Sequence, residues 1–188
     1  MTEPDIVDIF KDVVAEVSND LTIFYTDRKE NVVEIKNPKL NYIFGNGQYI
    51  KDELDAYSKS EDASSGKFPL VALFCPIKET KDSREYYSKD EVSLLIACSS
   101  TKDWSNEHRK VTSFQNILRP IYKRLKDVLL EDDRFDWGYE YIVKHNYLEN
   151  YSYGRYGAYT ESGEAVSEFI DAINISSMEL TIKNLNCR

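Results

Sequence analysis

Apolar residues recur every three or four positions near the start of the chain, a spacing typical of an amphipathic helix. These positions are Ile6, Ile9, Phe10, Val13, Val14 and Val17. They fall on one face of a helix, and we therefore predict a helix over residues 3–18. Thr2 and Asp5 form a capping box at its start, with Asp in the place of the usual Glu or Gln.

A second helical pattern begins near Asp103 and ends at Glu131, and it predicts the longest helix of the protein. Its apolar positions are Val111, Phe114, Ile117, Leu118, Ile121, Tyr122, Leu125, Val128 and Leu129. Asp103 or Ser105 can cap the start of this helix. Pro120 removes one backbone donor inside the pattern. Because the apolar positions continue beyond it, we predict a kink and not an end.

Continuous apolar runs at 68–75 and 92–98 predict two buried strands with both faces covered. Pro76 closes the first run, and the charged connector 78–90 joins the two. Two adjacent strands joined by about a dozen residues most simply form an antiparallel pair with a long tongue.

Weaker β-prone runs at 21–25 and 32–35 predict a hairpin, and residues 139–147 predict a further strand. Residues 170–183 alternate between apolar and polar, with a phase slip near Ser176-Ser177 that indicates a β-bulge. The pattern is weakest between residues 37 and 66, where Gly45-Asn46-Gly47 marks a turn.

These patterns predict an α+β fold. We expect a mixed, mainly antiparallel β-sheet, with the N-terminal helix and the long Pro-kinked helix packed on one face. A length of 188 residues favours a single domain over residues 1–188. Extended excursions are expected at about 26–66, 78–90 and 144–164.

Composition excludes several classes of function. The chain has 33 acidic and 24 basic residues, a net charge of −9, which disfavours broad binding to duplex DNA. No apolar run has the length of a membrane span, and residues 1–5 lack the pattern of a signal peptide. Three scattered cysteines favour synthesis in a reducing cytoplasm.

Motifs for catalysis or cofactor binding are not found, so we predict no enzyme, no metal site and no cofactor. The chain has no Walker A sequence and no Gly-rich dinucleotide loop. His108 and His145 are isolated, and Cys98 has no base at a recognisable spacing. An acidic group at Asp132, Asp133 and Asp136 lacks calcium-loop spacing, and a solvated helix end explains it more simply.

Two groups of residues are candidates for contacts with other molecules. One is the basic side of the long helix, Arg109, Arg119, Lys123 and Lys126. The other is a tyrosine-rich segment that contains Tyr147, Tyr151, Tyr153, Tyr156 and Tyr159. Tyrosine is enriched in interfaces because it gives a large contact area at low entropic cost. The competing interpretations are a solvated helix face and a hairpin that packs on its own sheet.

Several of these segments carry a resemblance to a known family. They are Lys67-Phe68-Pro69-Leu70-Val71-Ala72-Leu73-Phe74, Leu94-Leu95-Ile96-Ala97, Trp104, Arg109, Phe114 and Leu118-Arg119-Pro120-Ile121-Tyr122. This sequence of strand, charged hairpin, buried strand and long helix resembles the head–tail connector and tail-terminator proteins of tailed bacteriophages. The most similar members are the neck-ring proteins of crAss-like phages that infect Bacteroides. The resemblance covers about residues 65–130, and its motifs are structural.

The resemblance implies a structural virion protein without catalytic residues. Members of that family form closed rings stacked between portal and tail. The expected partners are therefore identical copies, the portal and other neck or tail rings, with genomic DNA passing through the lumen without sequence-specific binding. The protein would be made in the host cytoplasm and reside in the virion. We expect acidic loops to face the lumen, and the basic helix face to dock on an acidic loop of the next subunit.

Two other functions remain open from the sequence. The first is a monomeric protein-binding module of a mobile element that uses the tyrosine-rich segment. The second is a small hydrolase or nuclease that uses Asp132, Asp133 and Asp136.

Overall fold

A computed structural model of the protein describes residues 5–26, 30–58, 66–81, 87–101, 103–156 and 168–183. The elements in chain order are α1 (Ile6–Val17), β1 (Thr22–Thr26), β2 (Val32–Lys36), β3 (Asn41–Gly45), α2 (Gly47–Ser58), β4 (Leu70–Lys81), β5 (Tyr87–Ser100), α3 (Asn106–Arg109), the π-helix η1 (Lys110–Leu118), α4 (Arg119–Glu131), β6 (Asn146–Tyr156) and β7 (Glu168–Lys183). The fold is α+β, which confirms the predicted class.

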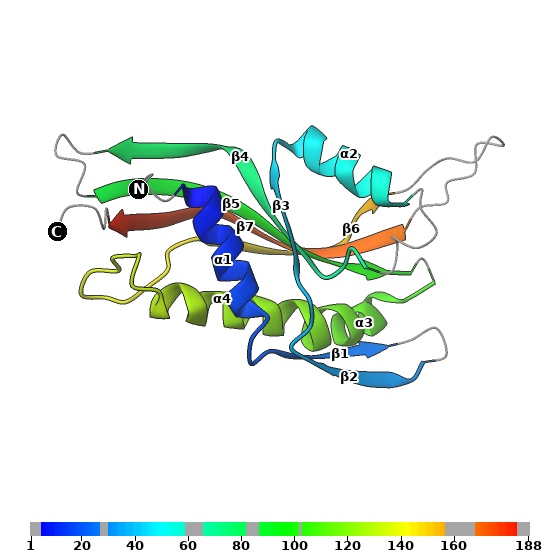
Figure 1. Cartoon of the computed structure of the whole chain (residues 1–188). Helices are drawn as coiled ribbons and strands as arrows, with labels where there is room; N and C mark the ends of the chain where they lie inside the picture. The colour runs from blue at the N-terminus through cyan, green and yellow to red at the C-terminus, as the bar shows by residue number, and fades with distance from the viewer. Residues whose placement is uncertain are drawn as a thin grey trace.

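Five strands form the central sheet in the order β3–β4–β5–β7–β6 (Figure 1). β3 runs parallel to β4, and the remaining neighbours are antiparallel. β4 and β5 pair as far as Lys81 and Ser88, which confirms the tongue predicted for the charged connector. β1 and β2 form a separate antiparallel hairpin, also as predicted.

The main core lies on one face of this sheet, between the strands and the helices α1 and α4. Leu94, Ile96 and Ile173 are alternate residues of β5 and β7, and they cluster with Phe10 of α1 and Leu125 of α4. Figure 1 shows α1 crossing the sheet and the α3–η1–α4 helix running along its lower side. The prediction that both helices cover one face is therefore confirmed.

A smaller core on the opposite face holds α2, an element that the sequence does not predict. Ile50 of α2 is buried in a cluster with Leu70, Ala72 and Leu95. Asn46 begins the helix, because its side-chain oxygen accepts a hydrogen bond from the Tyr49 amide at 2.8 Å. Much of the excursion expected at 26–66 is thus regular structure, namely β2, β3 and α2.

The long helix changes its hydrogen bonding along its length. Ser105 caps it, with its hydroxyl oxygen 3.2 Å from the His108 amide, which confirms one of the two predicted caps. In η1 the bonds span five residues, as the bond from the Arg119 amide to the Phe114 carbonyl shows. Pro120 follows as the second residue of α4, directly after the π-helix ends. The structure therefore has a change of helix type where a kink is predicted.

The π-helix also corrects the predicted apolar face of the long helix. Phe114, Leu118 and Leu125 are buried as expected, whereas Val111 is 44% exposed. A π-helix places more residues in each turn than an α-helix, so residues five apart share a face. Residues of the long helix before Phe114 therefore do not follow the α-helical pattern of buried and exposed positions that the sequence predicts.

Several predicted boundaries are wrong. Asp5, and not Thr2, caps α1, since its carboxylate accepts from the Val7 amide and its own backbone is extended. Residues 1–4 lie outside the described part. β4 continues through Pro76 to Lys81 after a register shift. Residues 139–145 form turns and irregular backbone, and the strand begins only at Asn146.

The bulge predicted in the last strand is confirmed. The register of β5 and β7 shifts between Val92 and Leu94, which pair with Met178 and Ile175. The extra residues lie in β7, and Ser177 there has a φ of 50°. This bulge returns the apolar positions on both of its sides to the main core.

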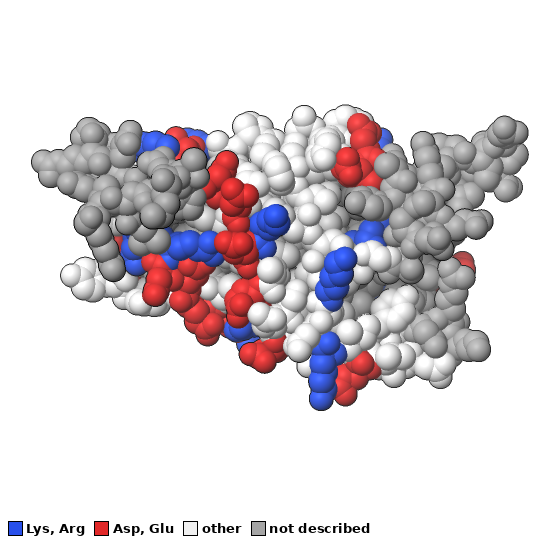
Figure 2. All heavy atoms as spheres, in the orientation of Figure 1, with Lys and Arg blue, Asp and Glu red and all other residues white. Residues whose placement is uncertain are grey.

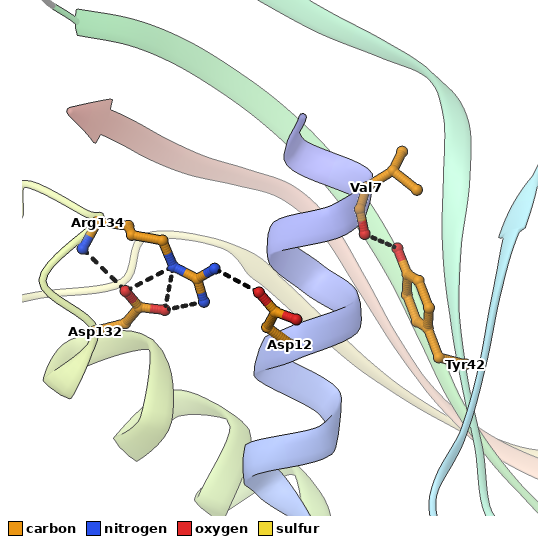
Figure 3. Close-up of polar contacts among 5 residues, drawn as sticks. All are labelled: Val7, Asp12, Tyr42, Asp132 and Arg134. Atoms are coloured by element: carbon orange, nitrogen blue, oxygen red, sulfur yellow. Dashed lines mark hydrogen bonds and ion pairs between the residues drawn. The ribbon is translucent and has the colours of Figure 1, made fainter. Parts of the chain in front are cut away.

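Polar contacts fix α1 to the rest of the fold (Figure 3). Arg134 follows α4 and donates to Asp12 of α1 at 2.9 Å, while its guanidinium also binds the Asp132 carboxylate at 2.7 and 3.0 Å. The Tyr42 hydroxyl of β3 donates to the Val7 carbonyl at 3.0 Å. These bonds join α1, the end of α4 and the edge of the sheet into one unit.

Candidate subunit-contact surfaces

Arg109, a candidate from the sequence, is buried and is not a surface residue. Its guanidinium donates to the Asp171 carboxylate at 2.8 Å and to the Thr101 carbonyl at 2.6 Å. The second Asp171 oxygen accepts from the Ser113 hydroxyl at 2.7 Å. Arg109 lies five residues before the buried Phe114, so the π-helix turns it inward. The expectation that Arg109 contributes to the basic outer face is therefore wrong.

The same cluster removes Cys98 from consideration as a nucleophile. Cys98 pairs with Asp171 in the β5–β7 register and is 2% exposed. Burial, and after it the Asp171 charge, raises the pKa of the Cys98 thiol far above its usual value. A buried, protonated thiol is a poor nucleophile and is not accessible to a substrate.

Arg119 and Tyr147, two other predicted candidates, meet on the surface between α4 and β6. Arg119 binds Glu149 through two hydrogen bonds of 2.7 and 3.0 Å, and the Tyr147 hydroxyl donates to the same carboxylate at 2.5 Å. The hydrogen bonds from Arg119 lower the pKa of Glu149 and raise that of Arg119. This ion pair fixes β6 to the long helix, so the Arg119 charge is largely satisfied within the chain.

Lys126 lies in an aromatic group beside this pair. Its ammonium is 4.6 Å from the Tyr122 ring centroid, and the Tyr122 hydroxyl is 2.7 Å from Nε2 of His145. The rings of Tyr122 and Tyr147 are 4.7 Å apart. Lys123 is exposed one turn away. The structure therefore brings together Arg119, Lys126 and Tyr147, with Lys123 as their neighbour.

The remaining tyrosine candidates differ in their burial and in whether the structure describes their side chains. Tyr151 is partly buried, with its ring 4.3 Å from that of Phe114 in the main core, so packing on its own sheet describes it better than a contact role. Tyr153 and Tyr156 belong to β6 by their backbone, but their side chains lie outside the described part. Tyr159 lies outside it altogether.

The hairpin β1–β2 is an exposed apolar surface that the sequence does not single out. All five residues of β2 are exposed, and Val32 is 61% exposed. We define the hairpin patch as Phe24, Tyr25, Val32, Val33 and Ile35. Tyr25, Val33 and Ile35 share the face of the buried Ile23, whereas Phe24 and Val32 lie on the other face. Among the described strands β2 pairs with β1 alone, so its outer edge has unpaired backbone donors and acceptors.

A second exposed surface follows α4 and continues into β6. We define this loop patch as Tyr139, Tyr141, Ile142, Tyr147 and Leu148, of which Tyr147 and Leu148 lie on opposite faces of β6. Tyr139 is fully exposed, and Tyr141 and Leu148 are 66% and 59% exposed. The sequence points to tyrosines here, but only Tyr147 belongs to both the predicted set and the observed patch.

The acidic group after α4 has structural partners. Asp132 binds Arg134, and the Asp136 carboxylate accepts from the Gly138 amide at 3.0 Å. Across the described ranges, no group of three or more His, Cys, Asp and Glu side chains is placed to hold a metal ion. None of the helices there has both the length and the apolar character needed to cross a membrane.

Negative charge gathers on the outer face of α1. Figure 2 shows a column of acidic side chains that follows this helix, beside a broad uncharged area. Asp5, Asp8, Asp12 and Glu16 are exposed at helical spacing. The structure therefore places a regular row of acidic groups on a helix, whereas the sequence predicts acidic loops.

Comparison of the chain with protein-family models and with curated protein sequences gives no match.

Proposed function

We propose that the chain is a structural subunit that assembles with copies of itself into a ring in the neck of a tailed bacteriophage, between portal and tail. The observation that carries this proposal is the placement of large apolar side chains in two separate surface patches. Exposed apolar surfaces of a few hundred Å² mark interaction sites in soluble proteins.

The polar groups of the described core support a structural role. The buried pair Arg109–Asp171 anchors the long helix to β7, and Arg134 anchors α1 to the end of α4. Each of these ionisable groups is held by partners within the chain. They stabilise the fold, and no nucleophile and base are brought together among them.

The separation of the two patches supports a ring over a two-fold dimer. In a ring, one patch of each subunit meets a different patch on the next copy, and closure follows from repeated rotation. The hairpin β1–β2 lies below α3, whereas the segment between α4 and β6, drawn in yellow in Figure 1, lies at the other end of the long helix. A head-to-tail contact therefore suits this chain better than a symmetric one.

The acidic row on α1 supports passage of DNA without binding. We propose that this face of α1 lines the lumen, because negative charge repels phosphate and removes the gain from counterion release. This assignment replaces the acidic loops with the exposed residues Asp5, Asp8 and Glu16. A ring whose inner wall is lined by Lys and Arg would contradict it.

The competing function is a monomeric module that binds one partner protein through the tyrosine-rich segment. The packing of Tyr151 on Phe114 takes one tyrosine away from that surface. The hairpin patch lies far from the segment along the chain and has no role in such a module.

Light scattering combined with negative-stain imaging of the purified chain tests the proposal. We expect a species many times the 21.9 kDa mass of one chain, with a central hole in the images. A monodisperse 21.9 kDa species at every concentration would favour the single-partner module.

A further inference from the structure

The outer end of β4 is held to the sheet by a short stretch of pairing. After the register shift that follows Phe74, residues 78–81 of β4 pair with residues 88–91 of β5. Among the described strands, β3 pairs with β4 only as far as Phe74, so residues 78–81 have a partner strand on one side alone. We call residues 78–81 the outer segment of β4. We infer that this segment is a pH-sensitive element, closed on β5 while Asp90 carries a proton and released as Asp90 ionises.

A single hydroxyl group joins two carboxyl groups across these strands. Glu79 and Asp90 are directly opposite each other in the register. The Ser88 hydroxyl oxygen lies 2.8 Å from a Glu79 oxygen and 3.2 Å from an Asp90 oxygen. A hydroxyl has one hydrogen to donate, and an ionised carboxyl group only accepts. Both contacts are therefore hydrogen bonds only when one of the two carboxyl groups is protonated and donates to Ser88.

The surroundings assign this proton to Asp90. The Lys81 ammonium lies 3.4 Å from the Glu79 oxygen that accepts from Ser88, so a negative charge on Glu79 has a counterion. Asp90 is 3% exposed, whereas the Glu79 side chain is 45% exposed, and burial disfavours the charged form of a carboxyl group. Protonated Asp90 then donates to Ser88, and Ser88 donates to ionised Glu79.

The other groups around Asp90 on balance disfavour its ionisation. Burial, and after it the Glu79 charge, raises the pKa of Asp90 to about 6. The charge of Asp5, at the start of α1, acts in the same sense, and the partner of Asp90 on β7 is the apolar Leu180. The Lys81 charge acts in the opposite sense but is a smaller effect than burial or Glu79.

Ionisation of Asp90 breaks this arrangement. The single Ser88 hydrogen then serves one carboxylate alone, and two like charges lie opposite each other across the strands, which is destabilising. Asp90 lies on β5 between β4 and β7, and β4 is the outer strand of the three at this point. Movement of the outer segment away from β5 separates the two charges and admits water to Asp90. Because the pKa is raised, closure is favoured most below pH 3.8 and this gain is lost as the pH rises through about 6.

Amide hydrogen exchange of the full-length chain, corrected for the intrinsic rate at each pH, tests this inference. We expect protection in residues 78–81 to fall about tenfold between pH 5 and pH 8, the change that a pKa shift from 3.8 to about 6 gives. Protection in residues 70–73 of the same strand should change less, because local opening leaves them paired. Asp90→Asn keeps a donor without a charge, so its outer segment should be equally protected at both pH values.

Glu91→Gln is the matched control. Glu91 forms an ion pair with Lys78 between the same two strands, but both side chains are exposed, so this variant should retain the wild-type response to pH. A wild-type response that persists in Asp90→Asn would show that another group holds the proton. Equal loss of protection in β4 and β7 would show that the proton stabilises the whole fold and does not control the outer segment.

A titration of the wild type keeps the test decisive even if Asp90→Asn does not fold. The carbon-13 signal of the Asp90 carboxyl group should move with a midpoint near pH 6, and a midpoint at the ordinary value of 3.8 would overturn the inference. Neither measurement requires that the chain form a ring, so the pH-sensitive element and the proposed function stand or fall separately.

Discussion

At the scale of single residues, Arg109 and Asp171 form a buried ion pair in the described core. Asp171 has no exposed surface, and both of its oxygens are held by side chains of the long helix. Removing one partner of such a pair leaves the other charge buried without compensation. The pair therefore fixes where the long helix lies on the sheet.

We predict that Asp171→Asn lowers the free energy of unfolding by about 3–5 kcal/mol, measured by urea denaturation. Glu107→Gln is the control, because it breaks the exposed Lys110–Glu107 pair and should cost less than about 1 kcal/mol. Equal, small losses in both variants would show that the buried pair does not anchor the helix.

Asp90 is a buried carboxyl with an unusual titration. It is 3% exposed on β5, and the Ser88 hydroxyl lies between it and Glu79, at 3.2 Å and 2.8 Å. Burial, and after it the Glu79 charge, raises the pKa of Asp90 from 3.8 to about 6. The folded chain therefore binds the Asp90 proton more tightly than the unfolded chain does. The stabilisation of the fold by protonated Asp90 is present below pH 3.8 and is lost as the pH rises through about 6.

We predict that Asp90→Asn stabilises the protein at pH 8 by about 2–3 kcal/mol and changes little at pH 4. Thermal or urea unfolding at both pH values measures this difference. The exposed neighbour Glu91→Gln serves as the control. A variant that is less stable than the wild type at pH 8 would show that the ionised carboxylate is used by the fold.

At the scale of elements, the sequence predicts the strands and helices that face the main core. Phe10, Leu94 and Leu125 belong to regular apolar patterns, and their elements appear as expected. β3 and α2 escape prediction because β3 shows no alternation of buried and exposed positions and α2 buries Ile50 in a small second core. Such elements are fixed by tertiary packing, which local pattern does not encode.

The π-helix explains why the exposure of residues on the long helix is only partly predicted. Periodicity of an α-helix places Arg109 outside and Val111 inside, and the structure reverses both. Lys126 and Tyr147 are correctly placed at the surface between α4 and β6. The hairpin patch has no signal in the sequence, because a β-prone run looks the same whether its side chains are covered or exposed.

The hydrogen bonds that join Arg134 to Asp12 and Asp132 give a further prediction. Arg134→Lys retains the charge but loses the planar fork that binds Asp132 and reaches Asp12. We expect faster amide hydrogen exchange along α1 and a loss of about 1 kcal/mol in stability. Lys11→Ala on the exposed side of α1 is the control. Unchanged exchange in α1 would show that apolar packing alone holds this helix.

At the scale of the whole molecule, the fold assigns different tasks to different surfaces. One sheet face packs α1 and α4, and the other packs α2. In the proposed ring, the acidic row on α1 lines the channel, and the hairpin patch and the loop patch meet neighbouring copies (Figures 1 and 2). A subunit that meets two neighbours and borders a channel needs three such surfaces.

The position of the chain in phage particles tests most directly whether it is a subunit of the neck. Particles are purified from cells that carry the genome encoding this chain, labelled with a gold-conjugated antibody against it, and imaged by electron microscopy. We predict label at the junction of capsid and tail in intact particles. Particles without label there, or label confined to the unassembled protein of the lysate, would contradict it.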